Sequence, residues 1–268
     1  MKKILEKFST WLKAQGISKH TQRAYLTVIK EVTKKVKIKN FSEDTLIDFL
    51  LTLNEEKSFS TLTVYKAGLR AFIKFRKLNI ILPPIAKKIK TNETPIHFTE
   101  KEFQKELLPL VSNFQNPLKV EALFTFMFYT GLRRSEVANL KRNEIDFDKQ
   151  SVKVLGKGNK IRVVGFPKKI IPLLKIYFGS DPEIKNAFNS SGENVRKYCD
   201  KLTELYGKIK ITAHTFRHSY GCRKRMKGMG GDTLSKLMGH SDSKTTQIYT
   251  KLRDEEILER DREIEEGE

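Results

Sequence analysis

The sequence predicts a mainly α-helical protein with one small antiparallel β-sheet, organised as two domains. Three features of the 268-residue chain predict this fold class. Large apolar residues recur every three or four positions over most of the chain, which is the spacing of helices with one buried face. Alternating and β-branched residues are confined to a short region after residue 144, which predicts two or three short strands. Pro83 and Pro84 then open a lysine-rich stretch with few large apolar side chains, which marks a domain boundary.

Residues 1–82 are expected to form a small bundle of four helices. Serine is a preferred N-cap because its hydroxyl accepts a backbone N–H that the helix leaves unpaired. Serines stand where the second, third and fourth helices should begin, at Ser18, at Ser42, and at Ser58 or Ser60. We expect residues 83–96 to be a basic interdomain linker; the alternative is an ordinary loop inside a single domain.

Residues 97–253 are expected to form the second domain. Helices are expected before the sheet at residues 99–113, 117–129 and about 133–140. The second of these helices is apolar nearly all round, which predicts that it is buried. Strands are expected at residues 145–147, 151–155 and 161–164, with residues 156–160 as the turn between the last two. Helices resume after Pro167, with a glycine-rich break at residues 228–231.

The chain is strongly basic, with 52 Lys and Arg residues against 32 Asp and Glu residues and a formal net charge of +20. The C-terminal segment 254–268 holds nine acids and two bases, so residues 1–253 carry a net +27. A folded chain this basic predicts a polyanionic partner, and double-stranded DNA is the leading candidate. No apolar run is long enough for a membrane span, and two cysteines are too few for a disulfide framework.

The segment Thr130–Val137 places two adjacent arginines and Glu136 at the predicted start of a helix. A planar guanidinium held there can donate two parallel hydrogen bonds to a phosphate, so Arg133 is a candidate phosphate clamp. Taken alone this signal is weak, because a solvated surface arginine gives the same pattern.

A second segment, Ala213–Tyr220, contains His214 and Arg217 three positions apart. On a helix the two share a face, which pairs a fixed cation with a group that exchanges a proton near neutral pH. One alternative is a zinc site, because His214, His218 and Cys222 recur every four residues. The other is a histidine that only caps the helix or packs in the core.

Two further motifs lie in turns or near the C-terminus. The turn Gly156–Lys160 carries Lys157 and Lys160; it lacks the residue order of a P-loop, but it could push an ammonium group into a groove. Gly239-His240 follows a predicted helix, and Tyr249 comes nine residues after His240. Taken singly, such a tyrosine is more often a half-buried aromatic than a nucleophile.

Together, these motifs resemble those of tyrosine site-specific recombinases of the Xer and phage-integrase kind. The order is Thr130-Gly-Leu-Arg133, a lysine in a strand turn, His214-x-x-Arg217, Gly239-His240 and then Tyr249. The resemblance covers about residues 97–253 and is weaker over the helical residues 1–82. It departs from the family at residues 221–227, where the family more often has an apolar helical run. It implies a two-domain clamp on DNA, with a helical core-binding domain and a catalytic domain.

The resemblance also implies an activity, the cutting and rejoining of DNA strands through a 3′-phosphotyrosine intermediate. Tyr249 would be the nucleophile, and Arg133 and Arg217 would clamp the phosphoryl oxygens. Other roles would fall to Lys157 in preference to Lys160 (proton donor to the leaving oxygen), His214 (proton transfer), His240 (phosphate binding) and Glu136 (orientation of Arg133 or His214). Because cationic side chains would stabilise the transferring phosphoryl group, no metal or other cofactor is expected.

Further expectations concern partners and biological role. DNA-backbone contacts are expected from basic residues of the linker and catalytic domain: Lys87, Lys88, Lys90, Lys141, Arg142, Lys160 and Arg223. By resemblance, the protein would act as a homo-oligomer, a synaptic tetramer on DNA, in the cytoplasm with the nucleoid. Xer-like dimer resolution and integration or excision of a mobile element stay open. Rival functions are a type IB topoisomerase and a DNA-binding relative without catalysis.

The acidic tail, residues 254–268, sets a few apolar side chains among its nine acids. We expect it to dock on a neighbouring subunit, or to cover the basic pocket when DNA is absent. The alternative is a frayed, solubilising tail.

Overall fold

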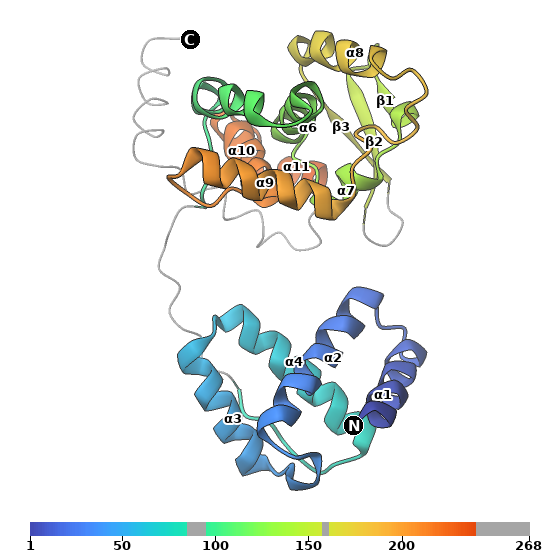
Figure 1. The fold of residues 1–268 in the computed structure, drawn as a ribbon, viewed down its shortest axis with the longest axis vertical. Helices are drawn as coiled ribbons and strands as arrows, with labels where there is room; N and C mark the ends of the chain where they lie inside the picture. Colours follow the sequence, from blue (N-terminus) through green and yellow to red (C-terminus); the bar gives the residue numbers. More distant parts are fainter. Residues whose placement is uncertain (85–94, 157–160, 240–268) are drawn as a thin grey trace. The chain divides into compact units, whose positions relative to one another are not determined.

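A computed structural model of the chain describes residues 1–84, 95–156 and 161–239. The chain divides into two compact units, Met1–Asn92 and Glu93–Glu268 (Figure 1). The described residues are mainly helical and contain one three-stranded antiparallel sheet, so the predicted fold class is confirmed. The exact boundaries of the expected linker stay a prediction, because most of it lies outside the described residues.

Within residues 1–84, the N-terminal unit has the helices α1 (Lys2–Ala14), α2 (Lys19–Lys35), α3 (Glu43–Glu56) and α4 (Phe59–Arg76), with a 3₁₀ turn, η1, at Ile38–Asn40. Serine side chains cap the last three α-helices. The Oγ atoms of Ser18, Ser42 and Ser58 each accept the backbone N–H three residues on, at 3.2, 3.2 and 3.3 Å. Ser58 is therefore the N-cap of α4, and the sequence signal located each of these starts.

Aromatic side chains fill the core of the N-terminal unit. Phe8 of α1 is fully buried, and its ring meets that of Phe72 edge to face at a centroid distance of 5.2 Å, a favourable geometry for two quadrupoles. Gly68 lets α4 lie close to α2, because a Cβ there would be 3.1 Å from Cγ1 of Val28. Apolar packing therefore holds this unit together.

The C-terminal unit begins with three short elements in place of the single helix expected over residues 99–113. These are α5 (Glu100–Glu102), a π-helical turn η2 (Phe103–Leu107) and a 3₁₀ segment η3 (Leu108–Asn113). Pro109 explains the break, since proline has no N–H to donate and its ring clashes with the preceding helical turn. Helical turns therefore run through residues 100–113, as expected from the sequence, but they change from α to π to 3₁₀ and do not form one regular α-helix.

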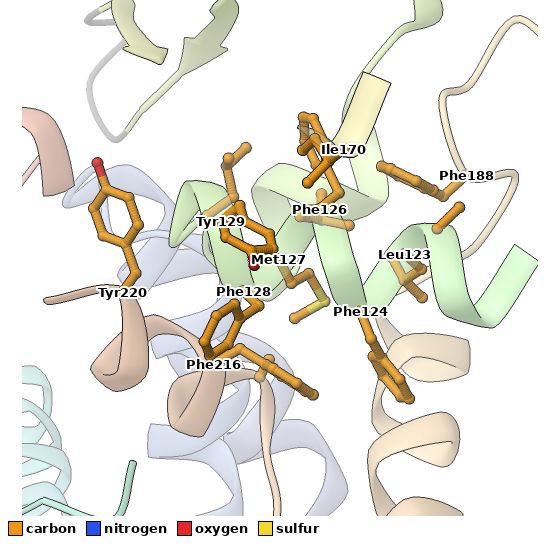
Figure 2. Packing of buried hydrophobic residues seen from close by; sticks show 14 of the residues in the cluster. Leu123, Phe124, Phe126, Met127, Phe128, Tyr129, Ile170, Phe188, Phe216 and Tyr220 are labelled. Carbon is orange, nitrogen blue, oxygen red and sulfur yellow. The ribbon is translucent and has the colours of Figure 1, made fainter. Parts of the chain in front are cut away.

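Within the described residues of this unit, the central helix is α6 (Pro117–Thr130), which packs against α8 (Ile171–Gly179), α10 (Ala213–Met226) and η3. The further helices in the described ranges are α7 (Arg134–Asn139), α9 (Gly192–Tyr206) and α11 (Gly231–Met238), with 3₁₀ turns η4 (Arg142–Glu144) and η6 (Lys168–Ile170). Helix α6 is buried nearly all round, as its apolar sequence predicts. Figure 2 shows its side chains entering the core in several directions. Phe124 stacks on Phe216 of α10 at 5.0 Å, and Phe126 packs against Phe188 at 5.3 Å.

The sheet has the order β1 (Ile145–Asp146), β2 (Ser151–Leu155) and β3 (Ile161–Gly165), with antiparallel neighbours. Val152 pairs with Val164 and Val154 with Arg162, so these four side chains share one face of the hairpin. The valines on that face are buried in the core. Arg162 is therefore directed toward the interior of the unit. None of the helices in the described ranges is long and apolar enough to cross a membrane.

Candidate active site

Arg133 stands at a sharp corner between α6 and α7. Gly131 ends α6 with φ at +62°, a left-handed conformation that favours glycine. A Cβ on Gly131 would lie 2.6 Å from Cδ1 of Tyr220, so close packing against α10 also requires glycine here. Arg133 is the N-cap residue of α7, and its side chain is 31% exposed. The corner therefore presents this guanidinium to solvent from a fixed backbone.

Glu136 holds both the backbone and the side chain of Arg133. Its carboxylate accepts the backbone N–H of Arg133 at 2.8 Å and the Nη1 of the same residue at 2.8 Å. Arg162 adds two parallel hydrogen bonds to this carboxylate, from Nη1 at 2.9 Å and from Nη2 at 2.8 Å. The buried carboxylate is thus paired with two arginines from different parts of the chain.

The pKa of the Glu136 carboxyl is lowered to about 2. Burial alone would raise this pKa, but the hydrogen bonds and positive charges of Arg162 and Arg133 outweigh burial. Glu136 is therefore ionised at neutral pH, and its charge offsets one of the two guanidinium charges beside it.

Helix α10 positions His214 and Arg217 on one face, as the spacing predicts. Arg217 is buried, with 3% of its surface exposed. Its Nη1 donates to the carbonyl of Gly131 at 2.7 Å, and its Nη2 donates to the carbonyl of Met238 at 2.5 Å. Arg217 therefore ties α10 both to the corner after α6 and to the end of α11.

Three arginines bind three successive carbonyl groups at the end of α11; we call Arg133, Arg162 and Arg217 the arginine cluster. The bonds run from Arg162 Nε to Leu237 O (2.8 Å), from Arg217 Nη2 to Met238 O (2.5 Å) and from Arg133 Nη2 to Gly239 O (2.6 Å). The last carbonyls of a helix have no partner within the helix and carry partial negative charge, so they attract cations. The end of α11 therefore gathers guanidinium groups from α10, β3 and the corner before α7.

His214 lies on the first turn of α10, beside this cluster. Partial desolvation lowers its pKa, and the charges of Arg217, Arg133 and Arg134 lower it further. A neutral imidazole of this kind can accept a proton at pH 7. The pKa of His218, one turn further along, is lowered to about 4, first by burial and then by nearby positive groups.

Several expected site residues lie outside the described residues: Lys87, Lys88, Lys90, Lys157, Lys160, His240 and Tyr249. The structure does describe residues next to two of these segments. Strand β2 ends at Leu155, two residues before Lys157, and β3 begins at Ile161. Gly239, which directly precedes His240, is bound by Arg133.

The three described candidates for DNA-backbone contact differ in setting. Lys141 is exposed. The Arg142 guanidinium lies 4.3 Å from the ring centroid of Phe178, and the Arg223 guanidinium lies 4.3 Å from that of Phe128. Burial lowers the pKa of both arginines. Packing over aromatic rings gives Arg142 and Arg223 a structural role, and the expected DNA-backbone contacts of Lys141, Arg142 and Arg223 stay predictions.

The zinc alternative was a second possible use of α10. Among the described residues, no group of three or more His, Cys, Asp and Glu side chains could hold a metal ion. Cys222 is buried, and the ring centroids of His214 and His218 lie 6.3 Å apart. The described side chains therefore give the zinc interpretation no site.

Arg162 is the site residue that the sequence interpretation missed. Its signal was present in the alternation of Ile161-Arg162-Val163-Val164, because Arg162 occupies the same side of the strand as Val164. A charged residue on the buried side of a strand needs a partner of opposite charge or carbonyl groups. That partner, Glu136, is 26 residues away in sequence, and only the fold reveals it.

The chain belongs to the phage integrase family, whose match covers residues 97–256. It is a tyrosine recombinase, an enzyme of DNA strand transfer. The XerA tyrosine recombinase of Thermococcus kodakarensis is 28% identical over 93% of this chain and 90% of that protein. A tyrosine recombinase of Thermosipho africanus is 28% identical over 96% of this chain and 97% of that protein.

Solved structures show the same fold. A lambda integrase dimer bound to a core site matches with a TM-score of 0.73 at 15% identity, over 95% of this chain and 96% of that chain. A XerH recombinase bound to its difH substrate matches with a TM-score of 0.66 at 20% identity, over 92% of this chain and 80% of that chain. The corner, the α10 face and the end of α11 therefore belong to a recombinase fold.

Proposed function

We propose that this recombinase cuts and rejoins specific DNA sites through a covalent 3′-phosphotyrosine intermediate. The arginine cluster is the observation that carries the proposal. Arg133 and Arg217 come from distant segments, yet they bind adjacent carbonyls at the end of α11. Two guanidinium groups oriented at one point suit a phosphodiester, whose negative charge spreads over its non-bridging oxygens during transfer.

In the proposed reaction, the phenolic oxygen of Tyr249 attacks the scissile phosphorus. The bond between phosphorus and the 5′ oxygen breaks, its electron pair stays on that oxygen, and Lys157 supplies the proton that the oxygen needs. The phosphotyrosine preserves a phosphodiester linkage, so a 5′-hydroxyl of the partner strand can attack it and release Tyr249. Arg133 and Arg217 hold the non-bridging oxygens in both steps, and His240 contacts the same phosphate.

His214 is proposed to accept the phenol proton of Tyr249. Its lowered pKa supports this role, because a neutral imidazole is the form that accepts a proton. The adjacent arginines also favour a phenolate near them, since positive charge lowers the pKa of a phenol. Glu136 keeps Arg133 in place through the backbone and side-chain bonds described above.

DNA is the proposed partner of both units, which would form a clamp joined by the linker 83–96. The excess of basic residues supports this, because phosphate contacts dominate the affinity of DNA-binding proteins. The proposed backbone contacts are those expected from the sequence: Lys87, Lys88, Lys90, Lys141, Arg142, Lys160 and Arg223. The similar XerH and lambda integrase structures are complexes with DNA, which supports DNA as the partner of this protein.

The protein is proposed to work as a homo-oligomer assembled on DNA, in the cytoplasm beside the nucleoid. The lambda integrase relative is a dimer on its core site, which supports assembly on DNA. The tail 254–268 is proposed to dock on a neighbouring subunit, since its acids would oppose DNA near its own basic surface. The similarity to XerA proteins over nearly their whole length favours a Xer-like role over integration of a mobile element.

Covalent trapping tests the proposed reaction. The protein is incubated with a pool of nicked duplexes whose arms are randomised, and covalent adducts are resolved on denaturing gels. The wild-type protein should form an adduct in EDTA, and Tyr249→Phe should form none. Tyr198→Phe, which changes a tyrosine of α9 away from the arginine cluster, is the matched control and should retain the adduct. An adduct in Tyr249→Phe would contradict the proposal.

A further inference from the structure

We propose that Arg162 is a positioning residue for cleavage, which sets the orientation of Arg133 through Glu136 and fixes the end of α11 ahead of His240. The inference deepens the proposed function and rests on it. It assigns a role to a buried ion pair that no motif in the sequence marks.

The contacts of Arg162 connect its own strand, β3, to two helices of the C-terminal unit, α7 and α11. From β3, its Nη1 and Nη2 bind both oxygens of Glu136 on α7 at 2.9 and 2.8 Å. Its Nε binds the carbonyl of Leu237 on α11 at 2.8 Å. The side chain also fills the space beside Gly239, where a Cβ would lie 3.3 Å from Cδ of Arg162. One guanidinium therefore fixes the spacing of β3, α7 and α11.

Arg162 differs from Arg133 in what its guanidinium can reach. Each of the three nitrogens of Arg162 donates a bond inside the protein, and the side chain is 12% exposed. Arg133 has 31% of its side chain exposed, and its bonds to described residues use two of the five N–H groups of an arginine. Arg133 is thus the arginine of this pair that can also bind a phosphate.

Glu136 links the two arginines electrostatically. A carboxylate shared by two guanidinium groups leaves one net positive charge at the pair. Without Arg162, the full charge of Glu136 would act on Arg133 alone and would favour a bidentate pair between them. That pair would turn Nη2 of Arg133 away from Gly239 and would neutralise the charge meant for the phosphate. Arg162 therefore keeps Arg133 both oriented and effectively cationic.

A purely stabilising role does not account for these contacts well. Buried ion pairs contribute little net stability, because desolvation offsets their attraction, and apolar replacements are often as stable. The location of Arg162 is more telling, since β3 begins directly after the segment that carries Lys157 and Lys160. The same strand thus leads from the expected proton donor to the anchor of the phosphate clamp.

The test compares single-turnover cleavage by Arg162→Met, Glu136→Gln and the double variant at saturating DNA. We expect Arg162→Met to slow cleavage 10-fold or more, because Arg133 would lose its orientation as a donor to the phosphate. DNA affinity should stay within about 3-fold of wild type. Glu136→Gln should slow the wild-type enzyme but should speed cleavage in the Arg162→Met background, because it removes the carboxylate that then competes for Arg133. Arg162→Lys should cleave at an intermediate rate, because it keeps a cation without the two parallel bonds.

Rates are normalised to protein competent for DNA binding, so that partial unfolding does not imitate the effect. The matched control is Arg196→Met, because Arg196 also binds two carboxylates but lies exposed on α9; it should cleave like the wild type. Wild-type rates in Arg162→Met, or additive losses in the double variant, would overturn the proposal.

A crystal structure of Arg162→Met provides a readout that does not depend on cleavage. We expect the bond from Arg133 Nη2 to the carbonyl of Gly239 to be lost, and an unchanged Arg133 would overturn the positioning role. Absence of any covalent adduct in the wild-type protein would instead refute the proposed function, and this crystal structure would still decide whether Arg162 positions Arg133.

Discussion

Two groups of arginines in the C-terminal unit are held by different kinds of contact. The arginine cluster donates hydrogen bonds to the end of α11 and to Glu136. Arg142 and Arg223 lie over aromatic rings, at 4.3 Å from the centroids of Phe178 and Phe128. Each also donates one hydrogen bond to a carbonyl, from Arg142 to Ile145 at 3.3 Å and from Arg223 to Phe128 at 3.1 Å, against the two or three that each arginine of the cluster donates. Both groups are drawn from a chain rich in basic residues, and composition does not distinguish them.

The difference lies in how each contact fixes a guanidinium. Hydrogen bonds to carbonyl and carboxylate oxygens fix the directions of individual N–H groups. A cation over a ring is attracted to the face and keeps more freedom to rotate. Orientation is what a phosphate clamp requires, so the arginine cluster suits catalysis, whereas the ring-packed arginines suit stability. Substitutions in each group should therefore change different measurements.

The largest effect is expected for Arg217→Lys. Lysine cannot reach the carbonyls of Gly131 and Met238 with two fixed donors at once, so it should clamp the phosphate poorly. Single-turnover cleavage should fall by about 10²-fold or more, as for other oriented donors in a transition state. Arg196→Lys on the exposed face of α9 should cleave normally. If cleavage by Arg217→Lys falls by less than about 3-fold, the hydrogen bonds of the arginine cluster do not orient a catalytic group.

The next effect concerns the backbone that presents the cluster. Gly131→Ala would combine a left-handed φ of +62° with a Cβ 2.6 Å from Tyr220. It should cost about 2–4 kcal/mol of stability, from backbone strain and overpacking together, measured by calorimetric unfolding. Gly207→Ala is the control, because φ there is +69° and a Cβ would meet nothing within 4 Å. Equal losses in the two variants would show that Tyr220 does not constrain the corner.

A smaller effect is expected from His218 on α10, whose pKa is lowered to about 4. The unfolded chain binds a proton near pH 6.5 but the folded protein does not, so this group's contribution to stability is present above pH 6.5 and is lost as pH falls toward 4. Burial is the largest cause of the lowered pKa, and the charges of His214, Arg217 and His97 lower it further. Between pH 7 and pH 4.5 the wild-type protein should lose free energy of unfolding, and His218→Gln should make this loss smaller by about 2 kcal/mol.

Unfolding by urea at the two pH values measures this loss. His20→Gln on the exposed side of α2 should keep the wild-type pH dependence. If His218→Gln also keeps it, another group is responsible for the acid sensitivity.

The smallest effect is expected for Arg223→Met. Methionine can fill the space over Phe128 and Tyr129 but loses the attraction of the cation, worth about 0.5–2 kcal/mol. It also loses the hydrogen bond to the carbonyl of Phe128, worth about 1 kcal/mol. The free energy of unfolding should fall by about the sum of these two contributions, whereas cleavage at saturating DNA should stay near wild type. A loss of DNA affinity without a loss of stability would show that Arg223 acts as a DNA contact and not in packing.

Local signals explain how much of the fold the sequence predicted. Ser18, Ser42 and Ser58 each bind a backbone N–H only three residues further on, so the sequence alone predicts these helix starts. The sequence of α6 is apolar on all sides, so its burial is also predictable. Pro109 is also plain in the sequence as a residue that disturbs a helix. The sequence does not show that the backbone around it forms π and 3₁₀ turns, because these depend on how the helix rearranges to accommodate the proline. Such an adaptation has no simple sequence pattern.

The site divides in the same way. Arg133, His214 and Arg217 stand in motifs whose spacing resembles that of a known family, so the sequence located them. Arg162 is bound to groups 26 and 75 residues away, and the rings that hold Arg142 and Arg223 become neighbours only in the fold. Long-range partners of this kind decide whether a basic residue faces DNA, a carboxylate or a ring.

Mass spectrometry of the trapped protein–DNA adduct tests the central claim most directly. After digestion with nuclease and trypsin, the account predicts a nucleotide attached to the peptide Thr245–Lys251, through Tyr249 and at a 3′-phosphate. The peptide His218–Arg223 contains the buried Tyr220 and should be unmodified. A nucleotide on that peptide, or attachment through a 5′-phosphate, would contradict the account.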